Sequence, residues 1–394
     1  MPLAADALDL HSRRPSVYLD QWVWIRLAKA DRGKPREASD PAVLAAVRDA
    51  SAAGVVFPLS ATHYMETSKV TSPRQRSDLA RTMASISRCR TLRSRRVLLR
   101  HQMLHAMHVS FGRPAFRPQP PEVLSAGLMW AFTGEPAPLT LHGPDGPVDP
   151  SAIPGMREFL RKANQFGEMR MLAGPADHEV EDLRRRGYRP EETTAVVSSR
   201  VDWETTYVGL LADDPVSRAE LRVRVQAREI LHEHLDLLNE LLAEYRLNLG
   251  REIGAGQAGS KSSRRRMIAF ADLMPSVRIA VDLKVELFRN AAKTWTMNAI
   301  HDIDALSMAV PYCHAVVPDS KMANLLSRSQ AGQRNGTLIV KSLTELPDLL
   351  PGLADQARSA GDDTARWDWA ASGGQYCLDE EDLLSDLPSR PPAA

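Results

Sequence analysis

Acidic residues follow two short apolar runs of the sequence, at the point where each run ends. Residues 17–19 precede Asp20, and residues 315–318 precede Asp319. We interpret both runs as buried strands of a parallel sheet. Further acids lie in segments with a helical pattern: Glu66, Asp302 and Asp304. Because the carboxyl ends of parallel strands meet at one edge of a sheet, we expect these carboxylates to converge there.

Carboxylates brought together in this way predict a metal centre. Like charges at short range raise each other's pKa values unless a cation lies between them. Hard oxygen ligands suit Mg²⁺ or Mn²⁺, and such an ion lowers the pKa of bound water and stabilises charge on an attacked phosphate. Taken alone, each acid is more typical of a turn or a helix cap. The prediction therefore depends on their order along the chain and on the elements between them.

The third ligand has two candidates, Asp302 and Asp304. Two residues apart on a helix, their side chains point about 160° apart, so both are not expected to reach one ion. We favour Asp302 because it lies nearer the start of the predicted helix.

The elements that must position these acids form a three-layer α/β pattern with a parallel sheet. In chain order we expect a strand at 17–20, two helices of which the second covers 41–53, a strand at 55–59, a helix carrying Glu66, a helix at 298–310, a strand at 315–319, a helix at 320–327 and a strand at 337–340. Between these two groups, residues 100–267 have helical periodicity without strand-like alternation. We therefore expect one core in two parts, at 14–100 and 268–352. A mainly helical insertion at 101–267 interrupts it, and an acidic, flexible tail follows at 353–394.

The ordered set of segments around Asp20, Glu66, Asp302 and Asp319 resembles the PIN domain family. The resemblance covers about residues 14–100 and 270–350, and each of its motifs is short. It implies a parallel sheet between helices and a metal-dependent nuclease, most often a ribonuclease. The family includes toxins of bacterial toxin–antitoxin pairs.

Carried over residue by residue, the resemblance makes Asp20 the first metal ligand, Glu66 the second, Asp302 the third and Asp319 the fourth. In the family, a residue with a hydroxyl group often follows the first acid. This chain differs, because Gln21 and Trp22 follow Asp20. We expect Ser60 or Thr62 to supply that support.

A basic block suggests a polyanionic partner. Between Lys69 and Arg117 there are twelve Lys or Arg and a single acid, Asp78. We expect these side chains to contact a nucleic-acid backbone, without reading sequence. The residues predicted to bind substrate are Ser60, Lys321, Arg88, Arg93, Arg95 and Arg96. The alternative is a solvated, arginine-rich helix face. The segment after Leu353 has nine acids against three arginines, and we expect it to shield the block.

The amino-acid composition narrows the classes of protein to which this sequence can belong. Hydrophobic residues make up 43% and charged residues 25%, as in ordinary globular proteins. The sequence has no apolar stretch of about 18 residues and no signal-peptide pattern near its start. Its three cysteines are scattered, which disfavours a disulfide framework. We expect a cytoplasmic protein, of bacterial type, without a membrane partner.

These observations favour a Mg²⁺- or Mn²⁺-dependent ribonuclease, expected to be an endonuclease, with RNA as substrate and an antitoxin or other protein as a further partner. One alternative is a catalytically weak PIN-like scaffold that binds RNA or a protein through its basic and helical surfaces. Another is a phosphatase of the haloacid dehalogenase type. That class needs Asp-x-Asp after the first strand, which Asp20-Gln-Trp does not provide.

Overall fold

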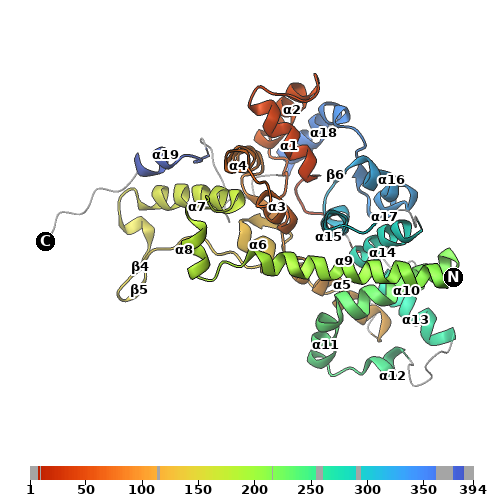
Figure 1. The fold of residues 1–394 in the computed structure, drawn as a ribbon. Helices are drawn as coiled ribbons and strands as arrows, with labels where there is room; N and C mark the ends of the chain where they lie inside the picture. Colours follow the sequence, from red (N-terminus) through yellow and green to blue (C-terminus); the bar gives the residue numbers. More distant parts are fainter. Residues whose placement is uncertain are drawn as a thin grey trace. The chain divides into compact units, whose positions relative to one another are not determined.

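The computed structural model describes residues 8, 10–112, 116–214, 216–253, 261–289, 294–360 and 376–385. The chain divides into two compact units, each built from three stretches of sequence. Unit 1 comprises Met1–Ser12, Arg95–Glu122 and Tyr188–Lys341. Unit 2 comprises Arg13–Ser94, Val123–Gly187 and Ser342–Ala394. Figure 1 shows a chain made mainly of helices, with a few short strands.

Unit 2 contains short strands and the helices packed around them. Its elements are β1 (Val17–Leu19), α1 (Gln21–Asp31), α2 (Asp40–Ala52), α3 (Ala61–Thr67), α4 (Pro73–Ser87), β2 (Arg90–Leu92), β3 (Leu124–Ala126), α6 (Leu128–Phe132), β4 (His142–Gly143), β5 (Gly146–Pro147), the 3₁₀ turns Pro150–Ala152 and Leu343–Glu345, α7 (Met156–Ala173), α8 (Val180–Arg185), α18 (Leu346–Ser359) and α19 (Glu380–Ser385).

The strands of unit 2 combine parallel bridges with antiparallel pairs. The Val17 amide donates to the Val56 carbonyl at 2.9 Å, and a parallel bridge joins Ser16 to Val56. A second parallel bridge joins Leu59 to Thr91 of β2. β2 then pairs with β3 in the antiparallel sense. All three residues of β1 are buried, as the apolar run predicts. Residues 17–19 form the expected strand, whereas residues 55–59 form only isolated parallel bridges and no strand. The strands β2 and β3 were not expected.

Unit 1 is a set of helices with one strand pair. Its elements are α5 (Arg95–Ser110), α9 (Pro190–Asp213), α10 (Arg218–Arg228), the π-helical turn η2 (Glu229–Glu233), α11 (Leu235–Glu244), α12 (Leu249–Ile253), α13 (Lys261–Asp272), α14 (Pro275–Phe288), α15 (Met297–Tyr312), β6 (Ala315–Val317), α16 (Ser320–Arg328), α17 (Ala331–Asn335) and β7 (Leu338–Ile339). β6 and β7 are parallel. Helix α14 is buried along most of its length and packs against α10, α15 and α16, so it forms the centre of this unit.

The chain thus combines many helices with short strands, some paired in parallel and others antiparallel. The finer prediction, a three-layer PIN-like domain, stays a prediction. Residues 101–267 are largely helical, as expected, but they do not form a compact body of their own. The stretches 101–122 and 188–267 belong to unit 1, and 123–187 belong to unit 2. Helix α7, for example, packs against α3 and α4 of unit 2.

The described part of the acidic tail is folded, which differs from the expectation of a flexible segment beginning at residue 353. Helix α18 continues through that position to Ser359 and packs against α2. Its buried stripe of Leu350, Leu353, Ala354 and Ala357 has the spacing of one helix face. Residues 376–385 are also ordered and lie beside α7 (Figure 1). Within the described residues, every helix is too short or too polar to cross a membrane.

Candidate functional site

Asp20 lies at the junction between β1 and α1. The backbone stays extended at this residue (φ −68°, ψ 159°), and the side-chain Oδ1 accepts a hydrogen bond from the Gln21 amide at 2.7 Å. The strand before it is fully buried, whereas Asp20 itself is half-buried. The buried strand and the helix start together hold this carboxylate at the edge of the apolar core.

Glu66 lies near the end of α3 and is electrostatically coupled to Asp20. Burial, and after it the negative charge of Asp20, raise the pKa of Glu66 to about 7, while Lys69 acts in the opposite direction. The structure therefore brings together, within unit 2, two of the acids that the sequence predicted as ligands. A carboxylate with this pKa gains from a neighbouring cation, because the cation offsets both the burial and the repulsion.

His63 connects the two segments that carry Asp20 and Glu66. Its Nδ1 lies 3.0 Å from the Ser60 amide, which can only donate, so Nδ1 is the acceptor. Its Nε2 therefore carries the proton and donates to the Leu19 carbonyl at 2.9 Å. Burial lowers the pKa of His63 to about 3, so the ring stays neutral. This link joins the residue before Asp20 to the first turn of the helix that carries Glu66.

Gln21 forms a second link between the same elements. Its side-chain amide donates to the Thr67 Oγ1 at 3.1 Å, and its amide oxygen is buried with no hydrogen-bond partner in the described part of the chain. The residue that departs from the family pattern thus connects α1 to α3. Neither Gln21 nor His63 was identified from the sequence, because apolar periodicity carries no signal for a polar bridge.

Ser60 belongs to a buried hydroxyl cluster and not to an exposed substrate surface. Its Oγ lies 2.6 Å from the Thr62 Oγ1 and 3.1 Å from the Tyr18 hydroxyl. Ser60 is only 8% exposed. The prediction that Ser60 binds substrate is therefore corrected: the residue supports the β1–α3 corner. Burial, and after it the charge of Asp20, raise the pKa of the Tyr18 phenol.

Replacing Glu66 with glutamine should stabilise the metal-free chain above neutral pH. The folded-state pKa of Glu66 lies above its ordinary value of 4.5, so the folded chain binds more protons than the unfolded chain between pH 4.5 and 7. The stability contribution of Glu66 is present below that window and is lost as the pH rises through it. We expect Glu66→Gln to be about 2 kcal/mol more stable than the parent at pH 8 and nearly equal at pH 4.

Urea unfolding in EDTA at both pH values measures this difference. Glu37→Gln, at an exposed site in the same unit, is the control and should change neither value. An equal effect of Glu66→Gln at pH 4 and pH 8 would contradict the electrostatic origin of the shift.

Asp304 is bound by arginines within unit 1. Its carboxylate accepts from Arg200 at 2.6 and 2.9 Å and from the Arg95 Nη1 at 2.6 Å. Burial raises the pKa of Asp304, but the charges of Arg95 and Arg200 and the hydrogen bonds from Arg200 lower it to about 2. The carboxylate is thus already neutralised. The prediction of Asp304 as an alternative metal ligand is corrected on this ground, and Asp302, half-buried on another face of α15, remains the third candidate.

Asp319 repeats the local geometry of Asp20. It follows β6, keeps an extended backbone (φ −64°, ψ 164°) and caps α16 by accepting from the Met322 amide at 2.6 Å. Asp319 and Lys321 are both half-buried. Asp302 and Asp319 belong to unit 1, and Asp20 and Glu66 to unit 2. Within the described residues, no group of three or more His, Cys, Asp or Glu side chains is arranged to hold a metal ion.

The arginines predicted to bind substrate have partners within the chain. The Arg93 guanidinium lies 4.2 Å from the Trp130 ring centre and donates to the Gly134 carbonyl at 2.9 Å. Arg95 binds Asp304. These two side chains are structural, which corrects their predicted role.

Two other arginines of the predicted set are less firmly held. Arg96 forms an ion pair with Glu240 while remaining largely exposed, and such surface pairs are weak. Arg88 is half-buried at the end of α4, with a left-handed backbone.

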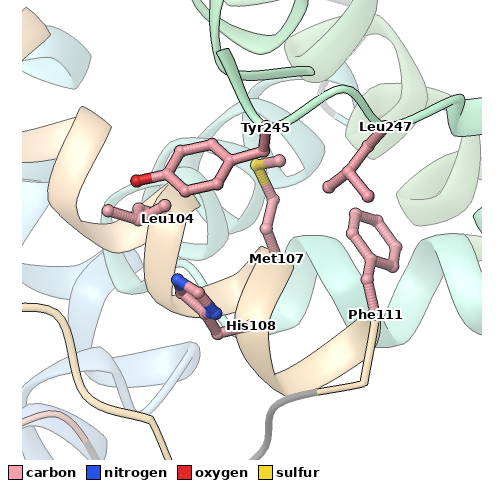
Figure 2. Close-up of a pocket in the computed structure, with 6 residues that line it drawn as sticks. All are labelled: Leu104, Met107, His108, Phe111, Tyr245 and Leu247. Atoms are coloured by element: carbon pink, nitrogen blue, oxygen red, sulfur yellow. The ribbon is translucent and has the colours of Figure 1, made fainter. Parts of the chain in front are cut away.

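A small cavity in unit 1 is lined mainly by apolar side chains. Its volume is about 150 Å³. Figure 2 shows Met107 of α5, and Phe111 just beyond the end of that helix, facing Tyr245 and Leu247 across it. The lining is apolar apart from His108 and the Tyr245 hydroxyl and contains no carboxylate, so the cavity does not have the donors of a divalent-metal site.

Comparisons with known proteins gave no match: no family model, no curated protein and no solved structure matches the chain.

Proposed function

We propose that this chain is a divalent-metal-dependent nuclease, most simply a ribonuclease, that hydrolyses phosphodiester bonds. The observation that carries the proposal is the coupling of Asp20 and Glu66 at the β1–α3 corner. Two carboxylates that interact electrostatically, on elements joined by buried polar links, are suited to a shared hard cation, and one of them has its pKa raised to about 7. The resemblance implies that Asp302 and Asp319 complete the ligand set.

The donor set fits Mg²⁺ or Mn²⁺. Asp20 and Glu66 supply carboxylate oxygens, and the buried amide oxygen of Gln21 lies on the same α1–α3 link without a hydrogen-bond partner among the described residues. Such an ion, when bound, lowers the pKa of a water molecule and stabilises negative charge on a phosphate.

The chain's own residues then have separate tasks. Asp20 and Glu66 would hold the cation, and His63 and Gln21 fix the elements that carry the two carboxylates. Lys321 is proposed to contact the phosphate that is attacked. Because His63 is neutral and fully buried, it orients the corner and does not exchange protons with substrate.

The proposal is tested by incubating the chain with labelled RNA, labelled single-stranded DNA and a small phosphate monoester, with Mg²⁺, Mn²⁺ or EDTA. We expect cleavage of RNA that requires the metal and is strongly reduced in Asp319→Asn. Hydrolysis of the monoester alone would instead indicate a phosphatase. Absence of cleavage, with RNA binding retained, would overturn the nuclease proposal and favour the binding scaffold.

A further inference from the structure

Residues 376–385 form an acidic segment that is fixed on the surface of unit 2. Tyr376 and Cys377 are buried, and the Cys377 amide donates to the side-chain oxygen of Gln165 in α7 at 2.9 Å. The short helix α19 then packs against α7 (Figure 1). Two buried side chains and one buried hydrogen bond hold the start of the segment, while its acidic part stays near the surface.

The acidic part pairs with basic side chains of α4 and α7. Asp379 forms an ion pair with Arg81 of α4, and the Asp382 Oδ1 lies 2.9 Å from the Lys162 Nζ of α7. Asp379 and Arg81 are 60% and 31% exposed. Ion pairs with this exposure contribute less than about 1 kcal/mol each, so a competing polyanion can replace them.

The charges of the two surfaces match. Helices α4 and α7 together contain seven basic and three acidic residues, a net charge of +4. The segment from Tyr376 to Ser385 has four acids and no basic residue, a net charge of −4. One of the seven, Arg76, is buried and binds backbone carbonyls, so it joins the helices while the other six remain at least partly exposed.

The segment does not fill the space in front of these helices. A cavity of about 470 Å³ remains at this contact, and its lining includes Arg81 and Arg170 of the two helices together with the acids of residues 379–381. Arginine presents paired donors that match phosphate as well as they match carboxylate. The carboxylates therefore occupy positions in which backbone phosphates of a nucleic acid fit.

We propose that the face formed by α4 and α7 is a binding surface for the phosphate backbone of RNA, and that residues 376–385 cover it as an intramolecular competitor. The choice of RNA as the polyanion rests on the proposed function. Binding of a strand replaces the ion pairs of Asp379 and Asp382 and releases counterions, so the competition is strongest at low salt.

RNA affinity tests the proposal by fluorescence anisotropy at about 50 mM salt in EDTA. Every variant carries Asp20→Asn, so that cleavage does not interfere and the result is independent of the nuclease activity. Asp379→Asn with Asp382→Asn should bind a labelled single strand about five- to tenfold more tightly than the background chain, because two competing charges are removed. Adding Arg81→Gln and Arg170→Gln should cancel this gain.

The control variant changes the net charge of the chain by the same amount but at a site outside α4 and α7. Glu192→Gln with Asp202→Asn removes two exposed acids of α9 in unit 1 and should leave the affinity nearly unchanged. Equal tightening in the control, or no tightening in the Asp379 and Asp382 variant, would overturn the proposal. Hydrogen exchange gives a second readout, because RNA should speed exchange of the Cys377 amide. If polyglutamate displaces the segment and RNA does not, the surface fits an acidic protein and the RNA assignment is wrong.

Discussion

Replacing Asp20 with asparagine is expected to lower metal-dependent RNA cleavage by about a thousandfold, since a metal site supplies several kcal/mol of transition-state stabilisation. Asparagine caps a helix about as well as aspartate, so the hydrogen bond from the Gln21 amide can be kept. The substitution therefore removes the charge and leaves the β1–α1 corner folded. Single-turnover cleavage at saturating Mn²⁺, together with the unfolding midpoint in urea, measures both effects.

Asp49→Asn is the matched control, because Asp49 is an exposed acid of the same unit. It should cleave at the parent rate. A fall of less than about threefold in Asp20→Asn would show that the carboxylate does not take part in the reaction, since a lost ligand costs far more. Loss of activity together with loss of the cooperative urea transition would point instead to an unfolded corner.

Replacing Lys284 with methionine should destabilise the chain by about 3–5 kcal/mol at pH 8, because it removes the ammonium group that pairs with two buried carboxylates. The Lys284 Nζ lies 2.7 Å from Glu204 and 2.8 Å from Glu229, and the lysine side chain is only 3% exposed. Glu229 is buried as well, and Lys284 holds its pKa well below the ordinary value despite burial. Together these ion pairs link α14, α9 and the π-helical turn at the centre of unit 1.

The effect of Lys284→Met should shrink toward pH 5. Without the ammonium group, the pKa of Glu229 rises, and its protonation then relieves the uncompensated charge. Denaturant unfolding at both pH values measures the change, with Lys341→Met at an exposed position as the control. A loss below about 1 kcal/mol at pH 8 would mean that the pairs behave as solvated surface contacts.

Local sequence patterns predicted most of the helices and strands around the candidate site. The apolar runs predicted β1 and β6 within about two residues, because each is a buried strand bounded by an aspartate that caps the next helix. Helix α2 lies within one residue of its prediction, since Pro41 in the first turn and Gly54 just beyond the end mark it.

Partners distant in sequence could not be predicted. Arg95 and Arg200 lie 209 and 104 positions from Asp304, so no local pattern indicates that they neutralise it. Sequence distance also hides the partners of the basic block. Its arginines have almost no acids near them in the sequence, yet Arg81 and Arg96 pair with acids 298 and 144 positions away. The His63 bridge depends on one ring between two backbone groups, which hydrophobic periodicity does not record.

Binding of Mn²⁺ to the intact chain, followed by electron paramagnetic resonance, tests the central claim most directly. The account predicts a site that is occupied in the parent chain and weakened at least about tenfold in Asp20→Asn and in Glu66→Gln, because each substitution removes one of two coupled carboxylates. Asp304→Asn should bind Mn²⁺ like the parent, since Arg95 and Arg200 already neutralise that carboxylate. Equal binding in the parent, Asp20→Asn and Glu66→Gln would contradict the metal centre.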